Sequence, residues 1–135
     1  MVKLIMGLKG SGKTKRLVSA INDAVKQESG SIVCIESGKQ LTYDIDYRVR
    51  LIDAKEYAIS NETLLRGFIS GLHAGNFDIT QVFIEGLYKI IGSDRAVAEE
   101  FINWCKAFGE ANSMSFTLSV SDEPDQVPES MKTLI

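Results

Sequence analysis

The chain has 135 residues, of which 44% are hydrophobic and 24% charged, and its formal net charge is -3. This length is close to the commonest size of one domain, and the ordinary apolar fraction with a small net charge argues against intrinsic disorder. No apolar run approaches the ~18 residues that a membrane-spanning helix needs, so we expect no membrane span. The mild acidity lacks the basic footprint of a nucleic-acid-binding surface, which disfavours a nucleic-acid partner. We therefore expect one domain over residues 1–135.

The two cysteines give no sign of a metal centre. Cys34 lies in an apolar run and Cys105 in a helical pattern, and a tetrahedral zinc site needs more donors than these two distant thiols. We expect both to be small buried hydrophobic residues in a reducing compartment. The short apolar run at residues 4–6 leads directly into glycine and lysine, unlike a signal peptide, so the sequence predicts a cytoplasmic protein.

The first elements alternate between strand and helix patterns. A β-rich run over residues 2–6 ends at Gly7, and a glycine-rich turn follows it. Apolar residues then recur at spacings of three and four over 13–26, which predicts an amphipathic helix that stops at residues 29–30. Residues 31–35 form a continuous apolar run of strand length, which is typical of a buried parallel strand.

The middle of the chain is less regular. Residues 41–45 alternate between apolar and polar side chains, which is compatible with a short antiparallel strand or with an extended loop. Residues 48–53 predict another strand, and its charged beginning places it near the edge of the sheet. Asn61 is the expected N-cap of a helix that carries an apolar stripe and ends at residues 75–76.

The last third repeats the alternation. Residues 79–84 predict a strand, and either Ser93 or Asp94 caps a long helix behind it. Alternating apolar residues over 114–120 predict the last strand, and Pro128 begins a short closing helix. Alternating strands and helices are typical of an α/β domain with a mostly parallel sheet. We therefore expect a three-layer α/β fold, with a sheet of about five strands and helices on both faces.

The glycine-rich turn is the most informative segment. It consists of Gly7, Leu8, Lys9, Gly10, Ser11, Gly12, Lys13 and Thr14, and it fits the pattern G-x-x-x-x-G-K-[S/T] at every fixed position. Glycines let such a turn aim several backbone N–H groups at anionic oxygens, and the following helix adds its positive N-terminal end. Lys13 would supply a point charge for the β- and γ-phosphates, and Thr14 a hydroxyl for Mg²⁺. Lys9, Lys15 and Arg16 add positive charge around the loop, and we count residues 7–15 as the candidate nucleotide-binding segment.

These residues resemble the Walker A motif of the P-loop nucleoside triphosphatase superfamily, and the strand–loop–helix–strand order resembles the core of that superfamily. The resemblance implies a site for a nucleoside triphosphate, ATP, together with Mg²⁺. Residues 7–14 also resemble the loop of pilus-retraction and secretion ATPases, but the acidic and histidine boxes of those longer proteins are not found here, so that likeness stops at Walker A. Several strands and helices separate the glycine-rich loop from Glu85, the next candidate site residue. This separation resembles the RecA-like division of the superfamily, in which another strand lies between the phosphate loop and the Walker B strand.

A second candidate site residue, Glu85, directly follows the apolar run 82–84. It would lie at the carboxyl edge of the sheet beside the glycine-rich loop, where ligands bind in open α/β sheets. This resembles the Walker B motif, with glutamate in place of the usual aspartate, and implies that Thr14 and Glu85 hold the metal and that Lys13 and Glu85 are catalytic. Many P-loop ATPases carry a glutamate base directly after that acid, whereas this chain has Gly86. If Glu85 binds Mg²⁺, no adjacent base remains and hydrolysis should be slow. If Glu85 is instead the general base, the metal lacks its carboxylate ligand.

Other polar residues at strand ends are weaker candidates. Glu36 and Asp53 follow apolar strands at a similar edge, and either is an alternative base, although a solvated strand end is the commoner role for such residues. Ser119 or Ser121, at the end of the last strand, is placed where RecA-like ATPases have a polar residue that contacts the γ-phosphate. A serine at a strand end is nevertheless a common structural feature.

The remaining polar residues give no site by themselves. His73, the only histidine, is expected to be exposed or to have ordinary partners, and Trp104 lies at helical spacing with core aromatics. An arginine finger acts in cis or comes from a partner. The candidates for that role are Arg48, Arg50, Arg66 and Arg95.

Three functions stay open from the sequence. The first is an ATP-binding protein with weak or partner-regulated Mg²⁺-dependent ATPase activity. The second is a small-molecule kinase that uses the same phosphate loop, with residues 38–50 as a candidate lid. The third is a non-catalytic, nucleotide-dependent interaction module whose site is completed by a protein partner or a second copy of the chain, with a contact surface around residues 38–50.

Overall fold

Five parallel strands form the middle layer of the computed structural model, which describes residues 1–27 and 29–135. The strands are β1 (Val2–Gly7), β2 (Ser31–Glu36), β3 (Arg50–Asp53), β4 (Ile79–Ile84) and β5 (Ser115–Ser121), in the order β1-β5-β4-β2-β3. Every neighbouring pair in this sheet is parallel. The expected three-layer α/β fold with a parallel sheet of about five strands is therefore confirmed.

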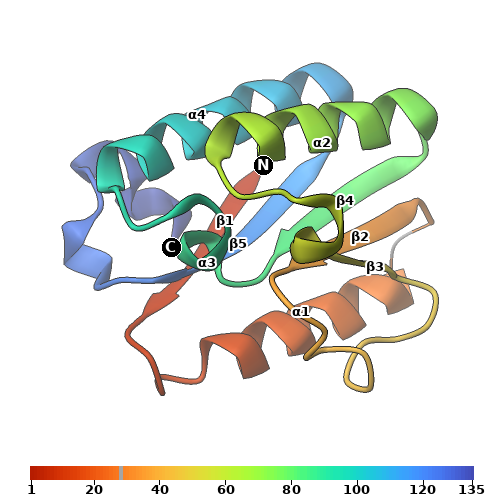
Figure 1. The fold of residues 1–135 in the computed structure, drawn as a ribbon, viewed down its shortest axis with the longest axis horizontal. Helices are drawn as coiled ribbons and strands as arrows, with labels where there is room; N and C mark the ends of the chain where they lie inside the picture. The colour runs from red at the N-terminus through yellow and green to blue at the C-terminus, as the bar shows by residue number, and fades with distance from the viewer. Residues whose placement is uncertain (28) are drawn as a thin grey trace.

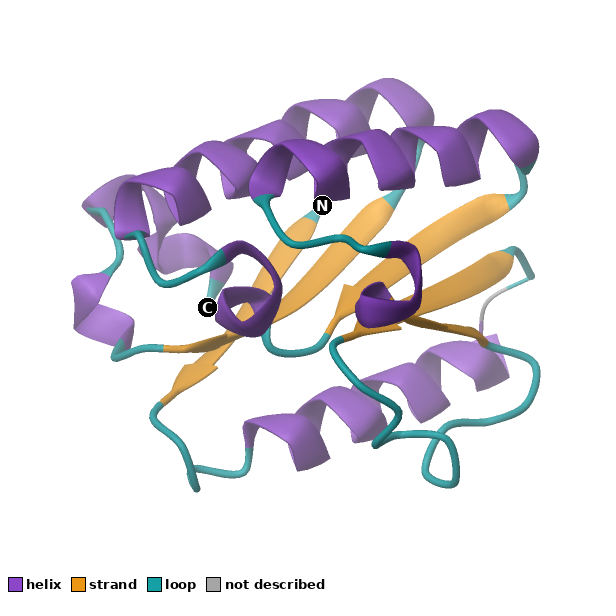
Figure 2. Ribbon diagram, in the orientation of Figure 1, coloured by secondary structure: helices purple, strands orange, loops and turns teal. Residues whose placement is uncertain are grey.

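Helices cover both faces of the sheet. Helix α1 (Lys13–Gln27) lies on one face, and α2 (Glu62–Gly75) and α4 (Arg95–Asn112) lie side by side on the other, as Figures 1 and 2 show. The short helix α3 (Leu87–Ile91) follows β4 directly at the carboxyl edge of the sheet. The 3-10 turns are η1 (Ala54–Tyr57), η2 (Pro124–Gln126) and η3 (Glu129–Leu134). Within the described ranges, no helix has both the length and the apolar character required to cross a bilayer.

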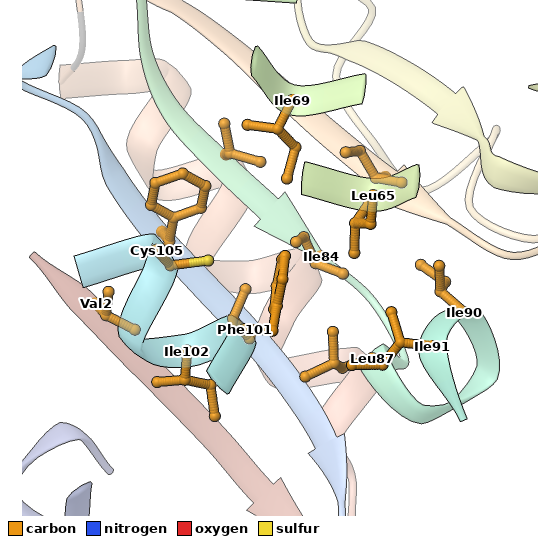
Figure 3. Packing of buried hydrophobic residues seen from close by; sticks show 14 of the residues in the cluster. Val2, Leu65, Ile69, Ile84, Leu87, Ile90, Ile91, Phe101, Ile102 and Cys105 are labelled. Carbon is orange, nitrogen blue, oxygen red and sulfur yellow. The ribbon is translucent and has the colours of Figure 1, made fainter. Parts of the chain in front are cut away.

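The strands bury side chains on both faces because a hydrophobic layer lies on each side. The larger layer packs against α2, α3 and α4 and includes Leu65, Ile69, Ile84 and Phe101 (Figure 3). Phe83, on the opposite face of β4, belongs to the smaller layer beneath α1. A fully buried side chain of this size contributes roughly 1.5–3 kcal/mol to stability. Continuous apolar runs such as residues 31–35 follow from this two-sided burial.

The helix caps agree with the sequence. Asn61 Oδ1 accepts a hydrogen bond from the N–H of Leu64 at 2.9 Å, which confirms it as the N-cap of α2. Asp94 rather than Ser93 caps α4, since its Oδ1 accepts from the N–H of Ala96 at 2.9 Å. Such a cap typically contributes about 1 kcal/mol.

Residues 41–45 form a turn and not a strand. Leu41, Ile45 and Val49 recur at a spacing of four and are buried in the layer beneath α1. Asn22 of α1 donates to the carbonyl of Asp44 at 3.2 Å and so ties the turn to the helix. Of the two alternatives left open by the sequence, the loop is therefore the observed one.

Other differences are local. Strand β3 lies at the sheet edge as expected, but it begins at Arg50, because Arg48 folds back onto the carboxylate of Asp46. The closing helix is the 3-10 turn η3, with Pro128 as its N-cap. Cys34 and Cys105 are fully buried as predicted, and burial raises the pKa of the Cys34 thiol to about 12.

The strand order positions the candidate site. Strand β5 lies between β1, which leads into the glycine-rich loop, and β4, which leads into Glu85. This is the separation by one strand that the sequence predicts. Because all five strands run in the same direction, Gly7, Ser121, Glu85, Glu36 and Asp53 meet at one edge of the sheet.

Candidate functional site

The glycine-rich loop needs its glycines for two different reasons. A Cβ at Gly7 would run into the Ser11 hydroxyl, so only glycine fits there. Gly10 and Gly12 have open space but adopt φ values of 86° and 85°, which side chains disfavour. The loop closes with a hydrogen bond from the N–H of Ser11 to the carbonyl of Leu8 at 3.1 Å. The loop therefore brings the chain from β1 into α1 as a tight turn, and Gly10 and Gly12 line the cleft beside it.

Lys13 is a buried cation at the start of α1. Only 8% of the residue is exposed, and its Nζ donates to the carbonyl of Leu8 at 3.0 Å. Burial lowers the pKa of Lys13, although the neighbouring Glu85 carboxylate acts in the opposite direction. The charges of Lys89 and Arg16 add to the lowering of this pKa. A cation held in such surroundings is well placed to gain energy from an anionic ligand.

Thr14 and Glu85 meet across the cleft. Thr14 Oγ1 donates to Glu85 Oε1 at 3.0 Å, although 71 residues separate them in the sequence. Glu85 is buried, and its own N–H donates to the carbonyl of Ile35 on β2 at 2.9 Å. The two residues that the sequence assigned to a metal are thus in direct contact.

The cleft around this pair has a volume of about 800 Å³, within the range typical of small-molecule sites. Its lining residues are Lys9, Gly10, Gly12, Lys13, Thr14, Lys15, Gln40, Glu85, Lys89 and Ser121. The candidate nucleotide-binding residues Gly7, Leu8 and Ser11 shape the loop and are not part of this lining. Sequence reasoning missed Gln40 and Lys89. The only signal for Lys89 is that it lies four residues after Glu85, the spacing of one helical turn.

The donors at this position suit Mg²⁺. Thr14 offers a hydroxyl and Glu85 a carboxylate, which are the hard oxygen ligands that this ion prefers. Within residues 1–27 and 29–135, no cluster of three or more histidine, cysteine, aspartate or glutamate side chains could hold a metal by itself. Mg²⁺ is commonly held by one or two protein oxygens together with substrate phosphates and water, so this small donor set fits an ion that arrives with a polyphosphate.

Glu36 and Asp53, the alternative bases, hold loops instead. Glu36 accepts backbone N–H groups from Gln40 at 3.1 Å and Leu41 at 3.4 Å. Asp53 accepts from Gly38 at 2.8 Å, and the bond from the Gly38 N–H lowers the pKa of Asp53. Burial raises the pKa of Glu36. Neither carboxylate lines the cleft, which makes both of them loop anchors in this structure.

The two candidate serines at the end of β5 have different roles. Ser119 is fully buried, and its Oγ accepts the N–H of Gly86 at 2.8 Å, which fixes the turn after Glu85. Ser121, two residues on, is exposed and lines the cleft. Register explains the difference, since Ser119 pairs with Ile5 in the middle of β1 and Ser121 with Gly7 at its end. Ser121 is therefore the one available to a ligand.

Among the described residues, none of the candidate arginines lines the cleft. Arg48 pairs with Asp46, Arg66 with Glu62, and Arg95 with Asp122. Arg50 is exposed at the beginning of β3, on the opposite edge of the sheet. His73 lies between Phe77 and Phe108, as part of an aromatic cluster with Trp104. The cations that line the cleft are lysines.

Comparison with known proteins adds no assignment. No family model matches the chain, and no curated protein matches it significantly. The functional interpretation therefore depends on the residues of the cleft and their geometry.

Proposed function

We propose that this chain binds a nucleoside triphosphate, ATP, together with Mg²⁺ in the cleft beside the glycine-rich loop, and that it hydrolyses the nucleotide slowly or under the control of a partner. The contact between Thr14 Oγ1 and Glu85 Oε1 at 3.0 Å carries the proposal. It joins the loop that fits the phosphate-binding pattern to the strand end that resembles Walker B. The free, buried cysteines 34 and 105 support the cytoplasmic location predicted from the sequence.

Each group has a role in this proposal. The turned backbone and the N-terminus of α1 bind phosphate oxygens, and Lys13 adds a positive charge for the β- and γ-phosphates. Mg²⁺, when bound by Thr14 and Glu85 with the phosphates, neutralises developing negative charge. Of the residues that the structure describes, Glu85 is the one carboxylate that lines the cleft, and Gly86 follows it. A site with one carboxylate for both metal and water should turn over slowly.

The substitution Lys13→Ala tests the proposal. The affinity for Mg²⁺-ATP should fall by about 100-fold or more, because charge-assisted hydrogen bonds to phosphate are lost. The fold should survive, since a buried cation whose pKa is lowered by burial contributes little stability. Equilibrium dialysis with labelled ATP measures the affinity, and Lys26→Ala, in the last turn of the same helix, is the matched control. Unchanged ATP affinity in Lys13→Ala would reject the proposal.

A small-molecule kinase is the second candidate, and one observation favours it. A depression of about 490 Å³ adjoins the cleft and is lined by Tyr88, Ser93, Arg95, Ser121 and Asp122. Ser121 lines both the cleft and the depression. A substrate whose hydroxyl accepts the phosphoryl group would therefore lie near the terminal phosphate when bound in the depression. Incubation with γ-labelled ATP and a panel of nucleosides and metabolites separates the candidates. Transfer of label to an acceptor supports the kinase, and label found only in inorganic phosphate supports the ATPase.

A partner-completed module is the third candidate. Tyr43 and Tyr47 are 99% and 92% exposed, and both lie in the segment 38–50 that the sequence marked as a contact surface. Exposed tyrosines are common in protein interfaces. Sedimentation with and without nucleotide tests this role. A monomer in both states that hydrolyses ATP at ordinary rates would count against it.

A further inference from the structure

Lys89 is a cation that the sequence did not assign to the site. It lies on α3, one turn after Glu85, and it lines the cleft. Its Nζ is 3.8 Å from Glu85 Oε2, whereas Glu85 Oε1 accepts from Thr14. The carboxylate thus lies between the Thr14 hydroxyl on one side and the Lys89 ammonium on the other.

The turn before α3 holds Lys89 in this position. Gly86 adopts a φ of 68°, and a Cβ there would lie 3.0 Å from Lys89 Cδ and 3.4 Å from its Cγ. The stem of Lys89 therefore passes directly over Gly86. The Gly86 N–H is fixed by Ser119 Oγ at 2.8 Å, and the neighbouring Tyr88 hydroxyl donates to Asp122 at 2.8 Å. The Gly86 backbone is thus anchored to β5, and the Tyr88 side chain to the residue that follows β5.

The charges in the cleft suggest what Lys89 binds. The arginines considered for a finger are paired with Asp46, Glu62 and Asp122 or lie at the other edge of the sheet. Lys13 serves the β- and γ-phosphates from within the loop, and Thr14 marks the metal side of the phosphates. Lys89 lines the same cleft from α3, whereas the other lysines of the lining belong to the glycine-rich loop and α1. Phosphoryl transfer needs a further positive charge at the terminal phosphate.

We propose that Lys89 is an in-chain ligand of the γ-phosphate and makes the cleft select nucleoside triphosphates over diphosphates. This inference rests on the proposed nucleotide-binding function. Lys89 is half-exposed, and its flexible stem lets the ammonium turn from Glu85 to a phosphate oxygen. The contact exists only when the γ-phosphate is present, so its energy appears in the ratio of ATP to ADP affinity.

The substitution Lys89→Gln tests this selectivity. Affinities of the full chain for Mg²⁺ with a non-hydrolysable ATP analogue and with ADP are measured by calorimetry. The analogue should bind about 10-fold more weakly to Lys89→Gln than to the wild type, whereas ADP affinity should change by less than about twofold. Lys89→Arg should restore most of the selectivity, because it retains the charge. Lys26→Gln removes one charge about 20 Å along α1 from Lys13, so it should leave both affinities unchanged.

Three negative results have different meanings. If the wild type binds both nucleotides through Lys13 but Lys89→Gln keeps the same ratio of affinities, the role of Lys89 is overturned and nucleotide binding stands. If the wild type binds neither nucleotide, the proposed function fails and the role of Lys89 fails with it. Equal loss of ATP-analogue and ADP affinity would show that Lys89 only orients Glu85, which also overturns selectivity.

Discussion

Two neighbouring strands of the sheet end in a buried glutamate, and the two glutamates have different surroundings. Glu85 follows β4 and meets side chains, the hydroxyl of Thr14 and the ammonium of Lys89. Glu36 ends β2 and meets backbone, the N–H groups of Gln40 and Leu41. One carboxylate faces the cleft, and the other closes a loop.

A position at the carboxyl edge of the sheet does not by itself make a residue part of the site. Both glutamates follow an apolar strand, and those strands are adjacent and parallel. What differs is the element opposite each carboxylate: α1 begins across from Glu85, whereas the chain after β2 turns back over Glu36. Partners that are side chains can exchange for a ligand at little cost, whereas buried backbone groups cannot.

Turnover should show the largest difference between the two glutamates. Glu85→Gln should lower the rate of ATP hydrolysis by about 100-fold or more, because either role open to it, metal ligand or base, needs the charge. Glu36→Gln should stay within about threefold of the wild type, since it does not line the cleft. Single-turnover assays with labelled ATP measure both rates. Similar losses in the two variants would contradict the distinction between them.

Stability should show the opposite order. Glu36→Ala should lower the free energy of unfolding by about 2 kcal/mol, because two backbone N–H groups lose their acceptor. Glu85→Ala should lose less than about 1 kcal/mol, since the Thr14 hydroxyl and the half-exposed Lys89 can turn to water. Urea denaturation of both variants provides the comparison. A larger loss for Glu85→Ala would mean that its contacts serve the fold before any ligand.

The sequence was sufficient wherever a pattern was long or local. The runs 2–6 and 79–84 and the helix after Asn61 have clear periodicity or a cap, and the structure confirms them within one or two residues. The turn at residues 7–14 was also correctly placed between a strand and a helix. These features depend on neighbouring residues in the chain, so the chain alone reveals them.

The features that the sequence missed depend on contacts between distant segments. Residues 87–91 are too few to show a period, so α3 and its Lys89 were not expected. Ser119 and Ser121 look equivalent until the register with β1 buries the first and exposes the second. Glu36 contacts the turn that follows β2. The sequence left residues 41–45 of this segment open as either a short strand or a loop, so these contacts could not be predicted.

Asp122, just beyond β5, is a further carboxylate at this edge, and its pairing gives the stability of the protein a pH dependence. Arg95 donates to both of its oxygens, at 2.8 and 2.9 Å, and this pairing lowers the pKa of Asp122 to about 2. A carboxylate whose folded pKa lies below its unfolded value of about 3.9 stabilises the protein above that value. The stabilisation is lost as the pH falls through the folded pKa. The loss should therefore occur between about pH 4 and pH 2.

Asp122→Asn should remove this pH-dependent contribution. The pKa shift sets an upper limit of about 2 kcal/mol, and solvent screening around the half-exposed Arg95 reduces it to about 1 kcal/mol. The difference in unfolding free energy between wild type and Asp122→Asn should thus be present at pH 6 and narrow toward pH 2. Asp125→Asn, at an exposed position three residues away, should show no such narrowing. A difference that stays constant with pH would mean that the Arg95 pairing does not set the pKa of Asp122.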